Sequence, residues 1–419
     1  MDETERPRAD LVVVNAGEVI TCRGAGDDPL GRISDGIVAV AGERILDVGT
    51  ADEVAQRVDL SGATPLDAER GIVAPGFVDC HTHVVFGGSR VEEYAAAVSG
   101  QLDSFRAHHT AGILATVEMT RAASFDELTD AAADRIEAMF AHGTTTVESK
   151  TGYGLTPDHE LKMLEVNQRL DREIQVDVVS TFLGAHAIPS GMSASRYTDQ
   201  VVDEMIPRVA EAGLADFCDV YCDEGYFSTD DSRRILAAGI DAGLAPKIHA
   251  DAYSDHGGAR LAAELGAVSA DHLNHTSRDD LELLAQRGVT GVVMPGLDFA
   301  VAHPHPFDPR AMLDAGVTIA LATDLCPGCW LESQQLVMAL AARLYGIAPE
   351  QALLAVTVGG ARALALDDRG VLAPGMLADL QVWDLESHLD LVYKLGRNAV
   401  TTVVKRGRVR VPEAVEAMT

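Results

Sequence analysis

The sequence predicts an α/β protein: a (β/α)8 barrel, or TIM barrel, joined to a small β-sandwich domain that the N- and C-terminal segments form together. From residue 72 onward, apolar strand-like runs alternate with amphipathic helical stretches, as in a parallel barrel. Both ends of the chain hold short β-rich pieces instead. A chain of 419 residues has room for a barrel of about 250 residues and a second unit. We therefore expect the barrel to span 71–365 and the composite domain to comprise 1–70 and 366–419.

The two flanks carry the strand signals of the β-domain. Strands are predicted at 11–15, 37–41 and 44–48, the last two joined by Gly42-Glu43, which favours a hairpin. After Pro374-Gly375 the chain returns to strand-like pieces at 379–383 and 400–410.

The central region supplies the barrel. Its eight predicted strands lie at 72–79, 144–149, 174–182, 216–221, 246–249, 268–272, 290–294 and 318–323. The clearest helical stretches between them are 112–122, 125–142, 232–242 and 279–287. Polar side chains gather where these strands end, and active sites of barrels lie at that end.

The charge of the chain limits its partners. It has 64 acidic and 33 basic residues, a formal net charge of −31. Nucleic-acid-binding proteins present clustered Lys and Arg, so no such partner is expected. No apolar run of about 18 residues predicts a membrane span. Acidic residues spread along the whole chain favour a halophilic source, because salt screens their repulsion.

The N-terminus and the cysteines indicate a cytoplasmic protein. Residues 1–6 are acidic and lack the apolar core of a secretory signal. Six cysteines are too few for a disulfide scaffold. Cys326 and Cys329 have the C-x-x-C spacing of redox or zinc sites, although burial as small apolar residues is the favoured interpretation.

The strongest chemical signal is the segment PGFVDCHTH at 75–83. In a strand, residues two apart project from the same face, so His81 and His83 point toward one place. His249 and Asp324 follow the fifth and eighth predicted strands. One histidine alone is usually an ordinary polar residue, but three imidazoles and a carboxylate at one end of a barrel suit zinc or iron(II), with a position open to water.

Four further residues lie near the same end of the predicted barrel. His272 ends the sixth strand and is expected either beside the metal or against a substrate carbonyl. His186 ends the third strand, where a structural hydrogen bond and a substrate contact are equally compatible with it. Arg90, seven residues after His83, can bind a carboxylate bidentately, although an isolated arginine is more often a surface charge. Tyr153 lies on a glycine-rich loop after the second strand.

These segments resemble known enzymes over nearly the whole chain. PGFVDCHTH and the closing PGMLADL resemble the amidohydrolase superfamily. Within it, HVVFGGSR, VESKTGYGL, FLGAH and SADHL resemble the imidazolonepropionase family. Members of that family act in histidine degradation and open the ring of 4-imidazolone-5-propanoate to give N-formimino-L-glutamate.

The resemblance implies a role for each candidate. One divalent metal, zinc or iron(II), would be bound by His81, His83, His249 and Asp324. The substrate would contact Arg90, Tyr153, His186 and Gly328, while His272 would lie beside the metal. The resemblance also implies a homodimer.

From the chemistry of a cyclic amide, we expect Asp324 to take a proton from water and return it to the leaving ring nitrogen. His272 would stabilise the developing oxyanion.

Two positions depart from the family pattern. Ala252 stands where the family has a glutamate, and Asp251 or Asp255 are the candidates to replace that carboxylate. Cys326 stands where the family has an asparagine, and a thiol is a weaker hydrogen-bonding group than an amide. These departures leave open another amidohydrolase, such as a deaminase or a cyclic-imide hydrolase. A redox or structural-zinc protein based on Cys326 and Cys329, and a non-catalytic binding barrel, are less favoured alternatives.

Overall fold

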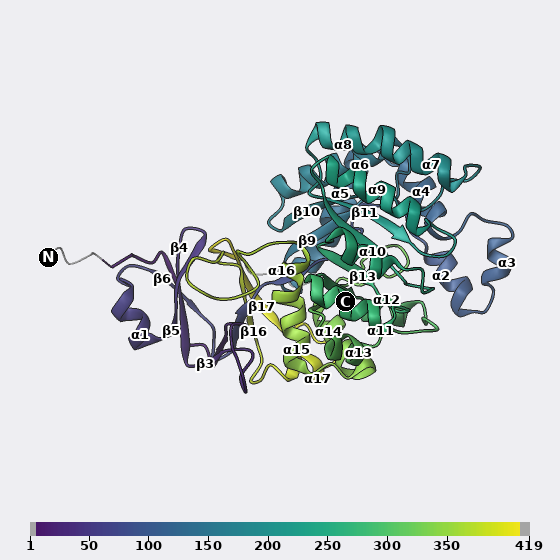
Figure 1. Cartoon of the computed structure of the whole chain (residues 1–419). Helices are drawn as coiled ribbons and strands as arrows, with labels where there is room; N and C mark the ends of the chain where they lie inside the picture. Colours follow the sequence, from purple (N-terminus) through teal and green to yellow (C-terminus); the bar gives the residue numbers. More distant parts are fainter. Residues whose placement is uncertain (1–5, 411–419) are drawn as a thin grey trace. The chain divides into compact units, whose positions relative to one another are not determined.

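The computed structural model describes residues 6–410 (Figure 1). The chain forms two compact units. The barrel unit contains 79–137 and 147–332, and the β unit contains the residues up to 78, 138–146 and those from 333 onward. The domain boundaries at 70 and 366 stay a prediction. Residues 1–5, which contributed to the argument against a secretory signal, lie outside the described residues.

Eight strands form one parallel sheet in the order β15-β14-β13-β12-β11-β10-β9-β8, which confirms the predicted (β/α)8 barrel. They are β8 (Phe77–Asp79), β9 (Thr144–Lys150), β10 (Asp177–Ala185), β11 (Phe217–Cys222), β12 (Ala245–Ala250), β13 (Ser269–His272), β14 (Thr290–Val293) and β15 (Ile319–Leu321). The segments that follow the first and last strands also pair. Asp324 N donates to His81 O at 3.1 Å, and His83 N donates to Leu325 O at 2.9 Å. These bonds bring the two ends of the sheet together.

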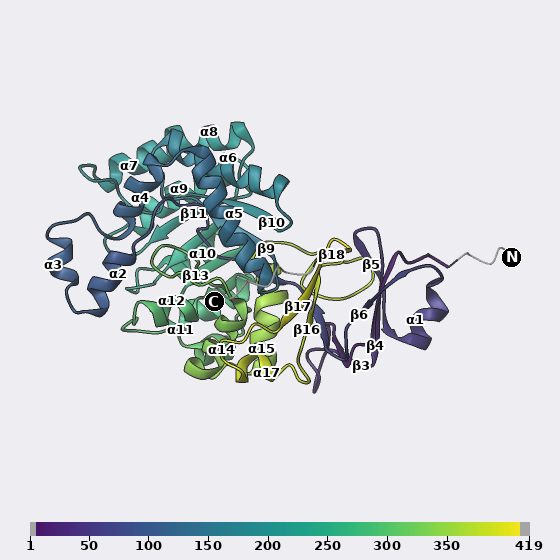
Figure 2. The same ribbon diagram turned by 180° about the vertical axis from the view of Figure 1, so that it is seen from behind.

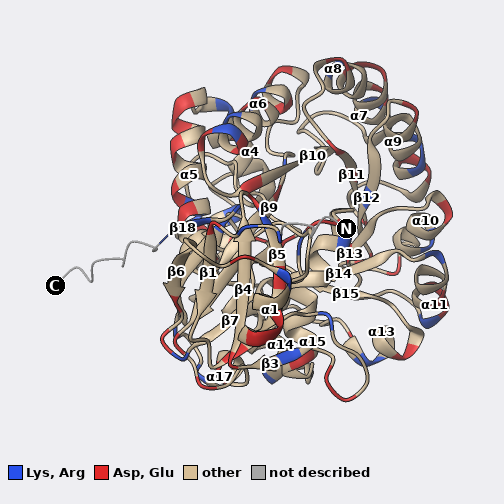
Figure 3. Ribbon diagram, turned by 90° about the vertical axis from the view of Figure 1, so that its left-hand side faces the viewer, with Lys and Arg blue, Asp and Glu red and all other residues tan. Residues whose placement is uncertain are grey.

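Helices lie outside the ring of strands, and acidic residues recur on them (Figure 3). Several begin with a side-chain cap: Thr156 accepts from His159 N before α6, and Ser228 accepts from Asp231 N before α9. The helices between the barrel strands are α2 (Val91–Val98), α3 (Leu102–Arg106), α4 (Gly112–Ala122), α5 (Phe125–Ala141), α6 (Pro157–Glu173), α7 (Ala194–Gln200), the π-helical η1 (Val201–Met205), α8 (Ile206–Ala212), α9 (Thr229–Asp241), α10 (Gly258–Leu265), α11 (Arg278–Arg287), α12 (Pro295–Ala300) and α13 (Pro309–Ala315).

The single strand predicted at 72–79 is wrong, because the chain divides it at Gly76. β7 (Ile72–Pro75) pairs with β16 (Leu380–Trp383) and β2 (Glu18–Ile20), whereas β8 belongs to the barrel. A Cβ on Gly76 would lie 2.4 Å from the Thr145 side chain, so the close approach requires glycine.

The β unit is a sandwich of two sheets, as predicted. One has the order β5-β4-β1-β6 and the other β18-β17-β16-β7-β2-β3, so strands from both ends of the chain share a sheet. Figure 2 shows β16, β17 and β18 side by side. The predicted hairpin at Gly42 joins β4 to β5. The remaining strands are β1 (Leu11–Val14), β3 (Arg32–Ser34), β4 (Gly36–Ala41), β5 (Arg44–Thr50), β6 (Thr64–Asp67), β17 (Val400–Lys405) and β18 (Arg408–Arg410).

The sandwich encloses an apolar core to which both sheets contribute. Val13 and Ile45 come from one sheet, and Val73, Leu380 and Val404 from the other. The other helical segments of the β unit are α1 (Ala51–Arg57), α14 (Gln334–Tyr345), α15 (Pro349–Leu354), the π-helical η2 (Ala355–Gly359), α16 (Gly360–Ala363) and α17 (Asp390–Tyr393). Within residues 6–410, no helix is both long and apolar enough to cross a membrane.

Candidate metal centre and active site

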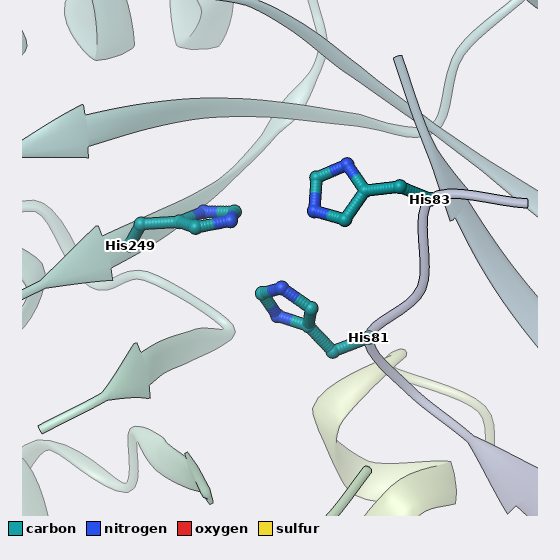
Figure 4. A group of neighbouring side chains, drawn as sticks. All are labelled: His81, His83 and His249. Atoms are coloured by element: carbon teal, nitrogen blue, oxygen red, sulfur yellow. The ribbon is translucent and has the colours of Figure 1, made fainter. Parts of the chain in front are cut away.

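Three of the predicted ligands meet in the barrel unit. Figure 4 shows the imidazoles of His81, His83 and His249 pointing toward one another. The centroid of the His81 ring lies 4.6 Å from that of His249 and 5.5 Å from that of His83. One ring nitrogen from each residue lies within 4.8 Å of the other two, and all three side chains are buried. Histidines from the segment after β8 and from β12 thus converge on one place.

Asp324 and His272 lie at the same place. Asp324 Oδ1 is 3.8 Å from the Nε2 atoms of both His81 and His83. His81, His272 and Asp324 form a second group with ligand atoms within 4.8 Å of one another. Both Asp324 and His272 have a positive φ, 48° and 79°. A backbone conformation with positive φ costs about 1–3 kcal/mol of stability at a non-glycine residue, and such strained residues cluster at functional sites.

The unpaired nitrogens suit a metal ion. Among the described residues, Nε2 of His81 and Nε2 of His249 are buried without a hydrogen-bond partner. Burial lowers the pKa of His81, His83 and His249 far below the usual value, so their imidazoles are neutral, as metal binding requires. Neutral imidazoles with one carboxylate are ligands that a divalent ion accepts.

A layer of buried charges lies behind these ligands. His81 Nδ1 is hydrogen-bonded to Asp271 Oδ2 at 2.6 Å, which leaves its Nε2 free for the metal site. His249 Nδ1 lies 3.0 Å from Asp219 Oδ2. Lys150 Nζ is 2.8 Å from Asp219 and 3.2 Å from Asp271, so one ammonium group links the two carboxylates.

Sequence reasoning missed this layer. Burial alone would lower the pKa of Lys150, but Asp219, Glu148 and Asp271 raise it well above its usual value. Lys247 Nζ adds a contact of 2.9 Å to Glu148. The sequence did contain a signal for this layer. Strands of a parallel barrel are usually continuous apolar runs, and these charged residues interrupt the runs of four strands.

The predicted substrate-contacting residues that follow β10 and β9, His186 and Tyr153, lie beside the metal-ligand candidates. His186 stacks on His83 with ring centroids 4.7 Å apart, and Tyr153 lies 5.2 Å from His186. Burial lowers the pKa of His186 to about 4, and of His272 to about 4 as well. Both imidazoles are therefore neutral at physiological pH.

The Tyr153 loop is held by one carboxylate that sequence reasoning did not select. Glu160, on the first turn of α6, is fully buried. It accepts hydrogen bonds from the backbone nitrogens of Gly152, Gly154 and Leu155 at 3.0, 2.8 and 2.7 Å. The glutamate fixes the path of the backbone on both sides of Tyr153.

Arg90 and Gly328 also come together. A Cβ on Gly328 would lie 3.7 Å from Arg90 Nη1 and 3.7 Å from Cys326 Sγ. Arg90 already has a partner, because its Nε and Nη2 donate to Glu93 at 2.8 and 3.0 Å. Glu93 thus orients the guanidinium group and leaves Nη1 facing the loop that contains Gly328.

The two candidates for the missing glutamate lie in different settings. Asp251 accepts from the backbone nitrogens of Gly258 and Ala259 and from the Thr276 hydroxyl, so it caps α10. Asp255 is exposed. Ala252 itself is buried.

A cavity of about 510 Å³ opens beside the segment that follows β10. Its lining includes Ala187, which follows His186, and Tyr226, whose ring stacks on Tyr221 at 4.0 Å. Tyr221 lies 5.3 Å from the His249 ring. None of the proposed metal ligands or substrate-contacting residues lines this cavity, so it borders the site through Ala187 and Tyr226 without enclosing it.

Comparison with known proteins identifies the family. The amidohydrolase family model matches residues 229–410. Imidazolonepropionase of Halobacterium salinarum is 43% identical over 409 residues, covering 96% of this chain and 98% of the relative. Imidazolonepropionase of Geobacillus kaustophilus is 41% identical over 413 residues, with 95% and 97% covered. The chain belongs to the imidazolonepropionase family.

Solved structures agree on the fold. An adenosine deaminase from Xanthomonas campestris with bound zinc superposes with a TM-score of 0.71 at 20% identity, covering 97% of this chain and 94% of that one. At this identity the likeness concerns the fold alone. This chain combines a cluster of histidines and an aspartate with a match to the amidohydrolase family. The combination suggests that it binds a divalent metal.

Proposed function

We propose that this chain hydrolyses the cyclic amide of 4-imidazolone-5-propanoate to N-formimino-L-glutamate, as a step of histidine degradation. The observation that carries this proposal is the convergence of His81, His83, His249 and Asp324 in a chain 43% identical to an imidazolonepropionase. The cofactor is one divalent ion per subunit, zinc or iron(II), since both accept nitrogen and oxygen ligands.

The residues divide the work between binding and proton transfer. A bound divalent ion would lower the pKa of a coordinated water and polarise the carbonyl. Asp324 accepts the proton of the attacking water and returns it to the leaving ring nitrogen. Burial raises the pKa of this carboxyl to about 8 even though Lys150 lowers it, and a divalent ion bound beside it would keep the carboxylate in the ionised form that can accept a proton. His272, held neutral, donates a hydrogen bond to the developing oxyanion.

Four residues position the substrate. Arg90 Nη1 binds the propanoate, and the lack of a side chain at Gly328 leaves space for that carboxylate. Tyr153 and His186 hold the ring against the metal centre.

The decisive measurement combines metal analysis of the purified protein with an assay for formiminoglutamate. We expect about one zinc or iron per chain and stoichiometric product. Ammonia release is measured in the same reaction, because opening an imidazolone ring frees none, whereas a deaminase would release it. Ammonia without formiminoglutamate would favour the deaminase alternative, to which the substitutions at Ala252 and Cys326 give some support.

Asp324→Asn tests the proton-transfer role. Because base catalysis contributes about 10²–10⁴-fold, we expect kcat to fall by that factor while the far-UV circular dichroism is unchanged. Retention of more than about a tenth of kcat would remove Asp324 from this role.

Arg90→Ala tests recognition of the carboxylate. Losing a charge-assisted hydrogen bond from Nη1 should raise KM for the imidazolone acid by about tenfold. An uncharged ring analogue serves as the control, and its KM should change little. Equal effects on both compounds would contradict the assignment.

The remaining expectations concern the setting of the enzyme. We infer a cytoplasmic homodimer whose only ligand besides the metal is a small molecule, with no nucleic-acid or membrane partner. The net charge of −31 favours activity at high salt, where self-repulsion is screened. Analytical ultracentrifugation and activity measured from dilute buffer to molar salt test these two points. A monomer, or maximal activity in dilute buffer, would contradict them.

A further inference from the structure

The cavity of about 510 Å³ opens in the barrel unit between the segment that joins α3 to α4 and the segments that follow β10 and β11. Its volume falls within the range of about 300–1,000 Å³ that is usual for small-molecule sites. Its walls are mainly apolar, with Ala187 and Ile188 on one side, and its basic lining residues are Arg106 and His109. Such a lining suits a small organic anion, because apolar walls accept its body and a cation pairs with its charge.

The Arg106 guanidinium group is available to a ligand. Its side chain is exposed at the end of α3, and it forms no ion pair with any residue in the range 6–410. No acidic residue among those described lines the cavity. In a chain with a net charge of −31, the cavity is therefore a local positive site, and such a site raises the local concentration of anions.

One carboxylate connects the cavity to Arg90, which is proposed to bind the propanoate. Glu93 accepts hydrogen bonds from the backbone N–H of Gly112, a lining residue, at 3.0 and 3.2 Å. It also accepts from Nε and Nη2 of Arg90. Burial alone would raise the pKa of Glu93, but these hydrogen bonds and the charges of Arg90 and Arg106 lower it below its usual value. The two guanidinium groups thus act on one ionised carboxylate, Arg90 by direct contact and Arg106 from farther away.

Two other lining residues border the metal centre. Ala187 directly follows His186 in the chain. The Tyr226 ring stacks on that of Tyr221 at 4.0 Å, and the Tyr221 ring lies 5.3 Å from that of His249. Because the proposed metal ligands do not themselves line the cavity, a molecule bound in it would be held beside the metal centre and outside it.

We propose that this cavity is an entrance chamber in which Arg106 binds a small carboxylate anion, with His109 as a second hydrogen-bond donor, before Arg90 receives that anion in the active site. The identity of the anion as the imidazolone propanoate rests on the proposed function. The binding of a carboxylate in the chamber does not, because it follows from the cavity and its unpaired cation alone.

Chemical modification of arginine tests binding in the chamber without any measurement of activity. The metal-loaded full chain is treated with phenylglyoxal, which attacks exposed guanidinium groups, and peptide mapping gives the rate of modification at Arg106. Glutarate, an unreactive short dicarboxylate, should slow that rate by about fivefold once its concentration is a few times its Kd, since occupied molecules are protected. Glutaramide, which has the same length and no charge, should give no protection.

Two controls locate the protection. Arg172 is also exposed and forms no ion pair within the described part of the chain, but it lies in the last turn of α6, just before β10 begins and at the opposite end of the barrel from the active site. Its modification rate should not respond to glutarate. In Arg90→Ala the protection of Arg106 should persist. Equal protection of Arg106 and Arg172, protection by glutaramide, or loss of protection in Arg90→Ala would each overturn the proposal.

Two matched substitutions test whether the chamber serves the reaction. Arg106→Gln and Arg172→Gln remove the same charge, and both are assayed at one salt concentration at which far-UV circular dichroism shows a folded protein. We expect Arg106→Gln to lower kcat/KM for the imidazolone acid by about two- to fivefold, mainly through KM, as for other exposed charge contacts. Arg172→Gln should leave it unchanged, and an uncharged ring analogue should not distinguish the two variants.

The outcomes separate this inference from the proposed function. If the wild-type protein does not hydrolyse the imidazolone, the proposed function fails, and the protection of Arg106 still decides whether the chamber binds a carboxylate. If the protein hydrolyses the imidazolone but glutarate does not protect Arg106, the chamber is wrong and the function stands. If protection occurs but the two glutamine variants have equal kcat/KM, the role of the chamber in delivering substrate is wrong.

Discussion

The interior of the barrel and the core of the β unit are built on opposite principles. Inside the barrel, Lys150 is fully buried among Glu148, Asp219 and Asp271, directly behind the metal centre. The sandwich core of the β unit is a cluster of apolar side chains, Val73 and Leu380 among them. Burying apolar surface stabilises a fold by about 25 cal/mol per Å², whereas buried ions often lose more in desolvation than they gain from each other. The barrel thus gives up stability to orient its ligands. The β unit also buries an ion pair, Lys405 Nζ to Asp379 Oδ2 at 2.6 Å, but the cluster between its sheets is apolar.

Removing the buried cation is the strongest test of this comparison. Lys150→Met leaves two or three carboxylates uncompensated in the barrel, so we expect the free energy of unfolding to fall by about 3–5 kcal/mol. Because Asp271 and Asp219 orient His81 and His249, metal affinity should fall as well, by about 10–100-fold. Urea unfolding and metal titration measure the two effects. Unchanged metal affinity would show that the charged layer is unnecessary for the ligands.

A truncation in the apolar core is the matched opposite case. Leu380→Ala opens a cavity between the sheets of the β unit, and a buried leucine lost in this way costs about 3 kcal/mol. Here metal affinity and the KM for substrate should stay at their wild-type values. A loss of metal in this variant would mean that the two interiors do not have separate roles.

The smallest expected effect concerns a histidine of the β unit. Hydrogen bonds to Glu18 and Glu350 raise the pKa of His388 above its usual value despite partial burial. The charged form is therefore favoured by folding, and its stabilisation is complete below the unfolded pKa of about 6.5 and lost as pH rises through the folded pKa. His388→Gln should lower the melting temperature by about 2 °C or less at pH 6, and by nothing at pH 9. An effect that grows with pH would contradict this sign.

Local patterns in the sequence predicted the fold and much of the candidate site. The spacing of two predicts that His81 and His83 share a face, and strand ends predict that His249 and Asp324 join them. Partnerships between distant strands leave no such local pattern. Lys150 and Asp271 lie far apart in the chain, and only the closed barrel reveals that they pair. The split of one predicted strand at Gly76 likewise depends on Thr145, which approaches from β9.

Two other residues show that residue type alone does not determine which contacts a side chain makes at the site. Arg90 was predicted to bind a carboxylate, and the structure already gives it Glu93 as a bidentate partner. Asp251, a candidate for the missing family glutamate, is occupied by backbone nitrogens of α10. In both cases the residue type was informative, but its neighbours decide which of its possible contacts it makes.

The buried Glu160 has a consequence for how this enzyme could be altered. Since one carboxylate anchors three amides of the Tyr153 loop, the hydrogen bonds that hold the main chain there do not involve the Tyr153 side chain. Laboratory evolution could therefore exchange the tyrosine for other groups and explore new ring-shaped compounds without unravelling the turn. Libraries aimed at a different specificity should vary position 153 and leave position 160 untouched.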